Sequence, residues 1–179
     1  NPDRRVEAGV SLVDSGLSIL DRITVAEAEG HALAEARFVT EAVREDLPTK
    51  QELFTRIEDR VPPDTILASN TSSFPMSQIG EDLKQPGRAL VTHWFNPPHI
   101  VPLVEVVPSK ATDRKAVRLT LDLLGRIGKL TVPLNKESTG ILVNRIQGAM
   151  FRAIWHLLAE GGATPGRGER AERCPATHN

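Results

Sequence analysis

The stretch Thr65-Ile66-Leu67-Ala68-Ser69-Asn70-Thr71-Ser72-Ser73 decides the fold. Its first residues form a continuous apolar run, which is typical of a parallel strand that is covered on both faces of its sheet. Small polar residues fill positions 69–73, directly after this run. Ligands of open α/β sheets bind beyond the carboxyl ends of the strands, so these polar residues predict a ligand-binding edge, a helix N-cap, or both.

The rest of the chain alternates strand-like and helix-like segments around this stretch. Apolar residues recur every three or four positions from 113 to 128 and from 140 to 160, which is the period of an amphipathic helix. We expect strands at 22–25, 38–43, 65–70, 89–95, 103–107 and 130–134, and helices at 4–20, 48–61, 75–83, 113–128 and 140–160. This alternation predicts an α/β layer fold, and the long last helix predicts the start of a second, helical unit.

The composition is that of an ordinary globular protein whose partner is a small molecule or another protein. The 179 residues correspond to about one domain. Lys and Arg number 22 against 23 Asp and Glu, so there is no basic footprint of a nucleic-acid-binding protein. No apolar run approaches the roughly 20 residues of a membrane helix. Cys174 is the single cysteine, which excludes an internal disulfide and fits a cytoplasmic location.

The densest chemical signal is the run Thr92-His93-Trp94-Phe95-Asn96-Pro97-Pro98, followed by Glu105 on the next expected strand. A carboxylate that accepts one imidazole N–H leaves the other ring nitrogen free to act as a general base toward a substrate. The alternative is that His93 merely ends a strand and that Glu105 is a solvated charge. Glu105 lies within an apolar run, where an unpaired carboxylate is costly, so the sequence favours a His93–Glu105 pair.

Two further polar residues, Asn144 and His99, are considered as candidate site residues. Asn144 lies between apolar neighbours at the start of the last expected helix, so its amide needs a partner in the protein or in a substrate. His99 follows His93 by a short interval across Pro97 and Pro98, but no third ligand is close in sequence, so we expect no metal site.

Short motifs follow one another along the chain at 41–46 (EAVRED), 50–54 (KQELF), 68–73 (ASNTSS), 93–98 (HWFNPP), 102–107 (PLVEVV) and 140–145 (GILVNR). In order and spacing they resemble the NAD-dependent 3-hydroxyacyl-CoA dehydrogenase family, over about residues 1–165. The resemblance implies a Rossmann-type doubly wound α/β sheet that is followed by an all-α dimerisation domain. It also implies oxidation of (S)-3-hydroxyacyl-CoA to 3-oxoacyl-CoA with NAD, in fatty acid beta-oxidation or butanoate metabolism.

The resemblance also implies roles for single residues. His93 would be the catalytic base and Glu105 would orient it, while Ser72 and Asn144 would hold the substrate oxygen and help to place the nicotinamide. The positions that would contact the cofactor are Glu45, Lys50, Ser72 and Asn96. The implied partners are an acyl-CoA substrate and a second copy of the protein in a homodimer, with no nucleic acid and no membrane.

The chain departs from the family pattern at both ends. A dinucleotide site needs a glycine-rich turn after the first strand, and the only such match, Gly166–Ala171, has no strand before it. We therefore expect a sheet that lacks its first strands and its glycine loop. The expected domains are a partial NAD-binding domain at 1–137, the first helix of the helical domain at 138–165, and a disordered or foreign tail at 166–179.

Two other functions stay open at this point. The motifs at 96–98 and 102–105 also suit the gulonate dehydrogenase and lambda-crystallin branch of the superfamily, whose substrates are small hydroxy acids. A non-catalytic interaction module would tolerate the loss of a glycine loop. Activity of the complete protein on acyl-CoA thioesters rather than on L-gulonate separates the first alternative from a 3-hydroxyacyl-CoA dehydrogenase. Since the glycine loop is missing, we expect this chain alone to bind no NADH and to be inactive.

Overall fold

The computed structural model describes residues 22–26, 29–138, 140–162 and 164. The chain divides into two compact units, Asn1–Thr139 and Gly140–Asn179, and each is considered by itself. The helix expected at 4–20 and the tail expected at 166–179 lie outside the described residues.

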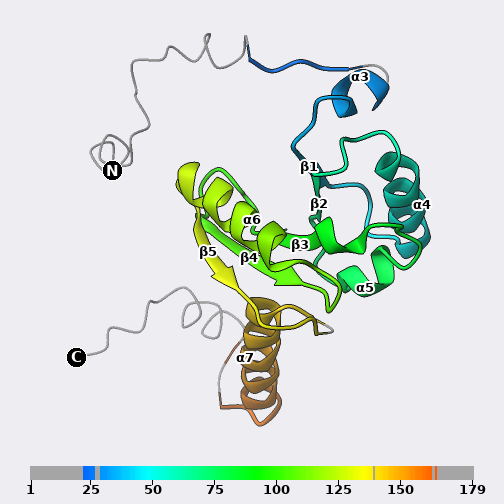
Figure 1. The fold of residues 1–179 in the computed structure, drawn as a ribbon. Coiled ribbons are helices and arrows are strands. Elements are labelled where there is room, and N and C mark those ends of the chain that lie inside the picture. Colours follow the sequence, from blue (N-terminus) through cyan, green and yellow to red (C-terminus); the bar gives the residue numbers. More distant parts are fainter. Residues whose placement is uncertain (1–21, 27–28, 139, 163, 165–179) are drawn as a thin grey trace, which may run out of the picture. The chain divides into compact units, whose positions relative to one another are not determined.

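The first unit is built on a five-stranded sheet (Figure 1). Its strands are β1 (Phe38–Glu41), β2 (Ile66–Ser69), β3 (Ala89–Trp94), β4 (Leu103–Pro108) and β5 (Leu130–Pro133), and they lie side by side in chain order. All neighbouring strands are parallel except β3 and β4, which are antiparallel. The connection between these two, residues 95–102, is too short for the crossover of about a dozen residues that parallel neighbours require.

Two layers of helix cover the sheet. Helix α4 (Leu47–Glu58) begins at Asp46, whose carboxylate accepts the N–H of Thr49, and α5 (Met76–Ile79) packs against α4 and β3. Helix α6 (Arg114–Arg126) packs against β4 and β5 (Figure 1). Two short elements, α3 (Glu29–Leu33) and η1 (Pro86–Arg88), complete the first unit.

The alternation of side chains along each strand sorts the residues between the two faces of the sheet. The α6 face holds one apolar cluster, made of Ile66, Ala68, Leu90, Val104, Val106, Ala116 and Leu124. The intervening strand residues therefore point to the α4 and α5 face. This second set includes Glu41, Ser69, His93 and Glu105, all of them buried. The buried ionisable residues of the strands thus gather on one face of the sheet.

Most expected elements are present, with shorter ends. The mixed α/β sheet with helices confirms the predicted fold class. The strand expected at 22–25 is wrong, because residues 23–26 are in neither helix nor strand and no described strand pairs with the exposed Ile23 and Val25. Helix α3 was not expected. In the second unit, α7 (Leu142–Ala159) agrees with the helix expected at 140–160.

Candidate active site

The carboxyl ends of three parallel strands carry the polar residues of the first unit. β1 ends at Glu41, β2 ends at Ser69, and β3 runs through His93 to Trp94. Asn70 joins two of these ends, because its backbone N–H donates to the carbonyl of Glu41 and its side-chain oxygen accepts the N–H of Trp94. This edge is where open α/β sheets bind their ligands.

His93 and Glu105 are cross-strand partners in the antiparallel pair of β3 and β4. The Nδ1 atom of His93 lies 2.8 Å from Oε2 of Glu105, and both side chains are almost fully buried. Since a carboxylate can only accept, Nδ1 carries the hydrogen, and Nε2 of the neutral ring is the free acceptor. The sheet register therefore builds the pair that the sequence predicted, with Nε2 as the base.

Ser72 and Phe95 lie against the imidazole of His93. The hydroxyl of Ser72 is 3.2 Å from Nε2, so it donates to the free acceptor of the neutral ring. The ring of Phe95 packs beside the imidazole at 4.6 Å between centroids, tilted by 58°. Both ring nitrogens thus have partners, and one aromatic neighbour limits rotation of the ring.

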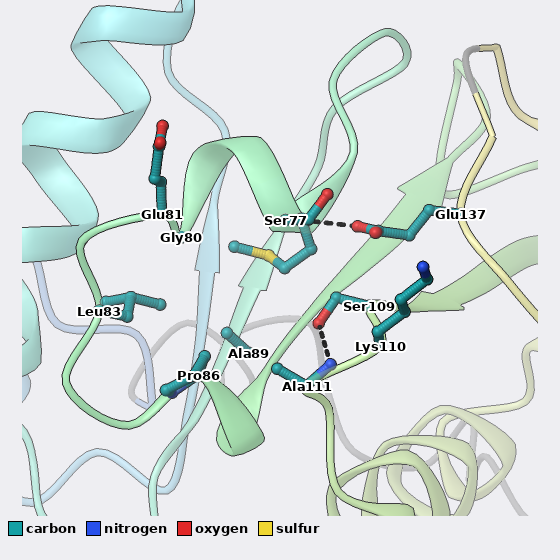
Figure 2. Close-up of a pocket in the computed structure, with 11 residues that line it drawn as sticks. Ser77, Gly80, Glu81, Leu83, Pro86, Ala89, Ser109, Lys110, Ala111 and Glu137 are labelled. Atoms are coloured by element: carbon teal, nitrogen blue, oxygen red, sulfur yellow. Dashed lines mark hydrogen bonds between the residues drawn. The ribbon is translucent and has the colours of Figure 1, made fainter.

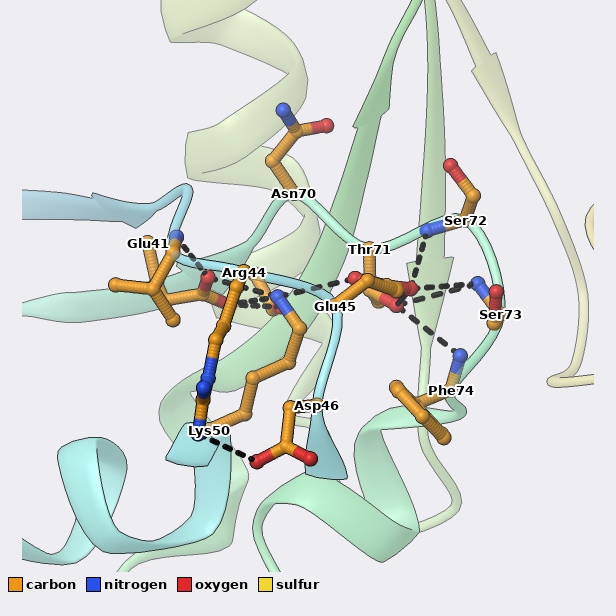
Figure 3. A network of polar contacts seen from close by, with 12 residues as sticks. Glu41, Arg44, Glu45, Asp46, Lys50, Asn70, Thr71, Ser72, Ser73 and Phe74 are labelled. Atoms are coloured by element: carbon orange, nitrogen blue, oxygen red, sulfur yellow. Dashed lines mark hydrogen bonds and ion pairs between the residues drawn. The ribbon is translucent and has the colours of Figure 1, made fainter. Parts of the chain in front are cut away.

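Glu45 holds the loop that carries Ser72 (Figure 3). Its Oε1 atom accepts the hydroxyl of Thr71 at 2.5 Å and the N–H groups of Ser72 and Ser73, each at 3.1 Å. Burial raises the pKa of Glu45, but the hydrogen bond from Thr71, the hydrogen bond and charge of Lys50, and the N–H of Ser72 together outweigh it. The pKa therefore lies below its ordinary value of 4.5, and the carboxylate stays charged.

Lys50 lies on α4, beneath Glu45, and its side chain is fully buried. Its ammonium is 2.8 and 3.0 Å from the two carboxylate oxygens of Glu41 and 3.2 Å from Oε2 of Glu45. Glu41 also accepts the hydroxyl of Ser69 and the N–H of Val43 (Figure 3). These contacts tie α4 to the ends of β1 and β2.

Two further expected site residues are Asn96 and Asn144. Asn96 is exposed in the loop after β3, and Lys129 anchors that loop by donating to the carbonyls of Pro98 and Val101 while its ammonium lies 5.3 Å from the ring centre of Trp94. Asn144 is half-buried in the first turn of α7, which belongs to the second unit. The structure therefore brings together His93, Glu105, Ser72, Glu45 and Lys50.

The sequence interpretation missed Glu41, Asn70 and Lys129. Asn70 lies inside the polar run that was singled out, so its position after a buried strand was an available signal. Glu41 ends a strand next to a motif, but its pairing with Lys50 depends on the tertiary structure. Lys129 lies between α6 and β5 and reaches the loop from there, and no local pattern predicts such a contact.

A separate open cavity of about 450 Å³ lies beside α5, between η1 and the end of β4 (Figure 2). Met76, Leu83 and Ala89 contribute apolar lining, and Ser109, Lys110 and Glu137 contribute polar groups. Glu137 accepts the N–H of Ser77 at 2.7 Å. None of the candidate catalytic residues lines this cavity, so it is distinct from the His93 site.

The part of the chain that the structure describes holds neither a metal-binding cluster nor a helix that could span a membrane. In residues 22–26, 29–138, 140–162 and 164, no three His, Cys, Asp or Glu side chains gather as they would around a metal ion. No helix in the same ranges has both the length and the apolar character needed to cross a bilayer.

The chain is similar to several known proteins. Residues 3–138 match the family model described as 3-hydroxyacyl-CoA dehydrogenase, NAD binding domain. The chain is 38% identical to L-carnitine dehydrogenase of Streptomyces griseus over 144 residues, which are 80% of this chain and 43% of that protein. It is also 38% identical to 3-hydroxyadipyl-CoA dehydrogenase of Escherichia coli over 136 residues, which are 75% of this chain and 28% of that protein.

Solved structures give the same result. The crystal structure of 3-hydroxybutyryl-CoA dehydrogenase from Escherichia coli superimposes with a TM-score of 0.82 at 34% identity, covering 91% of this chain and 34% of that one. The chain thus spans less than half the length of these relatives. The matched domain is the one that binds NAD in this family, which agrees with NAD as the expected cofactor.

Proposed function

The chain belongs to the 3-hydroxyacyl-CoA dehydrogenase family through its NAD-binding domain, and from this premise we propose that the intact protein oxidises the 3-hydroxyl group of an (S)-3-hydroxyacyl-CoA to a ketone with NAD. The observation that carries the proposal is the buried His93–Glu105 pair with the hydroxyl of Ser72 at Nε2. Such a reaction belongs to fatty acid metabolism, and we expect it in the cytoplasm.

In this reaction His93 is the general base. Its Nε2 atom takes the proton of the substrate hydroxyl, and the imidazolium that forms is stabilised by the carboxylate of Glu105 at Nδ1. The hydroxyl of Ser72 turns from Nε2 to the substrate oxygen and keeps that oxygen within reach of the base. Burial of the pair strengthens both interactions, because the local dielectric constant is low.

The residues at the carboxyl edge suit the nicotinamide end of NAD. Ser72 and Asn96 are exposed there and offer a hydroxyl and an amide. When bound, NAD supplies the acceptor for the hydride that leaves the substrate carbon. Among the described residues no glycine-rich turn follows a strand, so the contacts proposed for this chain are limited to that end. The proposed role of Asn144 rests on the motif match alone.

A small 3-hydroxy acid is the second candidate substrate, and the 38% identity to L-carnitine dehydrogenase favours it. L-carnitine and a 3-hydroxyacyl thioester both carry a secondary hydroxyl on the carbon β to the carbonyl carbon. His93, Glu105 and Ser72 contact only this shared part, so the same residues serve either substrate.

The test is NADH formation by the intact protein with (S)-3-hydroxybutyryl-CoA, L-carnitine and L-gulonate in parallel. We expect turnover of the thioester, and we expect His93→Ala to lower kcat by about 100-fold to 10,000-fold, the usual contribution of a general base. His99→Ala is the control, since His99 is exposed in the loop between β3 and β4, and it should leave kcat unchanged.

The other outcomes of this test distinguish the alternative functions. Turnover of L-carnitine alone supports the second candidate, and turnover of L-gulonate alone supports the gulonate dehydrogenase branch. Inertness toward all three, together with no binding of NADH, contradicts an oxidoreductase and supports a non-catalytic module. A loss in His93→Ala no larger than in His99→Ala contradicts the role of His93 as the base.

A further inference from the structure

We propose that Glu45 is a positioning residue that holds Ser72 against His93, and that Lys50 is the buried counter-ion that fixes Glu45. This deepens the proposed function, on which only the kinetic part of the inference rests. It gives both residues a role inside the fold, which differs from the direct cofactor contact implied by the family resemblance.

Lys50 is held between two carboxylates inside the protein. An ammonium group has three N–H donors and no acceptor. Lys50 contacts three carboxylate oxygens, two on Glu41 and one on Glu45, and its side chain has no exposed surface. Because the side chain of Lys50 is fully buried, it influences the site through Glu41 and Glu45.

Glu45 connects this buried cation to the catalytic loop (Figure 3). One of its oxygens faces Lys50, and the other accepts donors from Thr71, Ser72 and Ser73. Three consecutive residues of the loop are therefore bound to a single oxygen atom. Ser72 is the middle one, so its backbone is fixed on both sides.

The loop that Glu45 binds places the hydroxyl of Ser72 beside the imidazole of His93. This hydroxyl lies 3.2 Å from Nε2 of His93, which is near the limit of a hydrogen bond, so a small shift of the loop breaks the contact. A displacement of about 1 Å at a reacting group can cost about 100-fold in rate. The line of contacts from Lys50 through Glu45 and Ser72 to His93 therefore controls the geometry at the base.

The first test needs no substrate. Nuclear magnetic resonance of the intact protein measures the ¹⁵N shift of His93 Nε2 and the amide exchange of Ser72 and Ser73 in Glu45→Gln, in Ser72→Ala and in the control Glu52→Gln. Glu52 lies on the same helix as Lys50, is 79% exposed and forms an ion pair with Arg56 one turn later. We expect Glu45→Gln to speed amide exchange at both serines and to move the Nε2 shift most of the way to its value in Ser72→Ala.

The control should leave all these signals unchanged. An Nε2 shift that moves in Ser72→Ala and stays at the wild-type value in Glu45→Gln would overturn the proposal. If Glu45→Gln does not fold, Glu45→Asp takes its place, because the shorter carboxylate keeps the charge and cannot span the distance to both Lys50 and the loop. These readouts hold whether or not the protein oxidises a 3-hydroxy substrate.

The second test is kinetic and uses whichever substrate is turned over. We expect Glu45→Gln to lower kcat by about tenfold to 100-fold, with the KM for NAD changed by less than about threefold. The double variant Glu45→Gln/Ser72→Ala should be no slower than Ser72→Ala alone, since both changes break the same connection. A rise in the KM for NAD at unchanged kcat, or a double loss equal to the product of the single losses, indicates direct cofactor contact and overturns the proposal.

Discussion

Glu45 concentrates several interactions of the site on one carboxylate, and its ionisation makes them depend on pH. Burial opposes the charge, but Thr71, Lys50 and Ser72 together hold the pKa below 4.5. A folded pKa below the unfolded one adds stability that is complete above the unfolded pKa and is lost as the pH falls through the folded pKa. We therefore expect the free energy of unfolding, measured in urea, to fall as the pH drops below 4.5.

The variant Glu45→Gln isolates this contribution. It should be less stable than the wild type near neutral pH, and the difference should shrink as the pH falls below 4.5, because protonation removes the same charge from the wild type. The control Glu52→Gln changes an exposed carboxylate on the neighbouring helix. A difference between wild type and Glu45→Gln that stays constant into the acid range contradicts the role of the charge.

The sequence could predict some residues of the site and not others. The His93–Glu105 pair was predictable because a carboxylate within an apolar run needs a partner. The burial of Lys50 was not, since a lysine in an amphipathic helix is ordinarily exposed. Only the arrangement of β1 and α4 brings Glu41 to its ammonium.

The buried ion pair between Lys50 and Glu41 attaches helix α4 to strand β1. Lys50→Met leaves the carboxylate of Glu41 buried without its counter-ion, and we expect a loss of about 3–5 kcal/mol in the free energy of unfolding. Adding Glu41→Gln should restore part of the loss, since it removes the unpaired charge. The control Lys84→Met breaks an exposed pair with Asp59 and should change stability little. Equal losses in Lys50→Met and Lys84→Met contradict this interpretation.

The element boundaries show what local patterns can and cannot predict. The strands β2, β3 and β4 were predictable because each lies in an apolar run, which is typical of a buried strand. The antiparallel direction of β4 was not part of the prediction, although the short connection at 95–102 requires it. No strand forms at 22–25, because a short strand-like segment does not by itself supply a neighbouring strand to pair with. Helix α5 is shorter than expected and ends at Ile79, where Gly80 follows.

At the scale of the whole molecule, the family match and the fold concern mainly the first unit. The sheet, its helices and the polar edge all lie in Asn1–Thr139, whereas Asn144 lies in the second unit. The change of periodicity near residue 140 predicts a division into a nucleotide-binding and a helical part. The domain limits at 137 and 165 stay predictions.

The second unit supports the last prediction, a homodimer of the intact protein. Within the residues that the structure describes, α7 buries none of its side chains, and Ile146, Trp155 and Leu157 are more than half exposed. Exposed apolar side chains on one helix favour association, and tryptophan often contributes most to an interface. We expect sedimentation velocity to find a dimer, and Trp155→Arg to raise its dissociation constant at least about tenfold. Gln147→Arg adds the same charge at an exposed polar position of α7 and is the control. A monomer at all concentrations, or a dimer indifferent to Trp155→Arg, would show that α7 does not hold two copies together through this side chain.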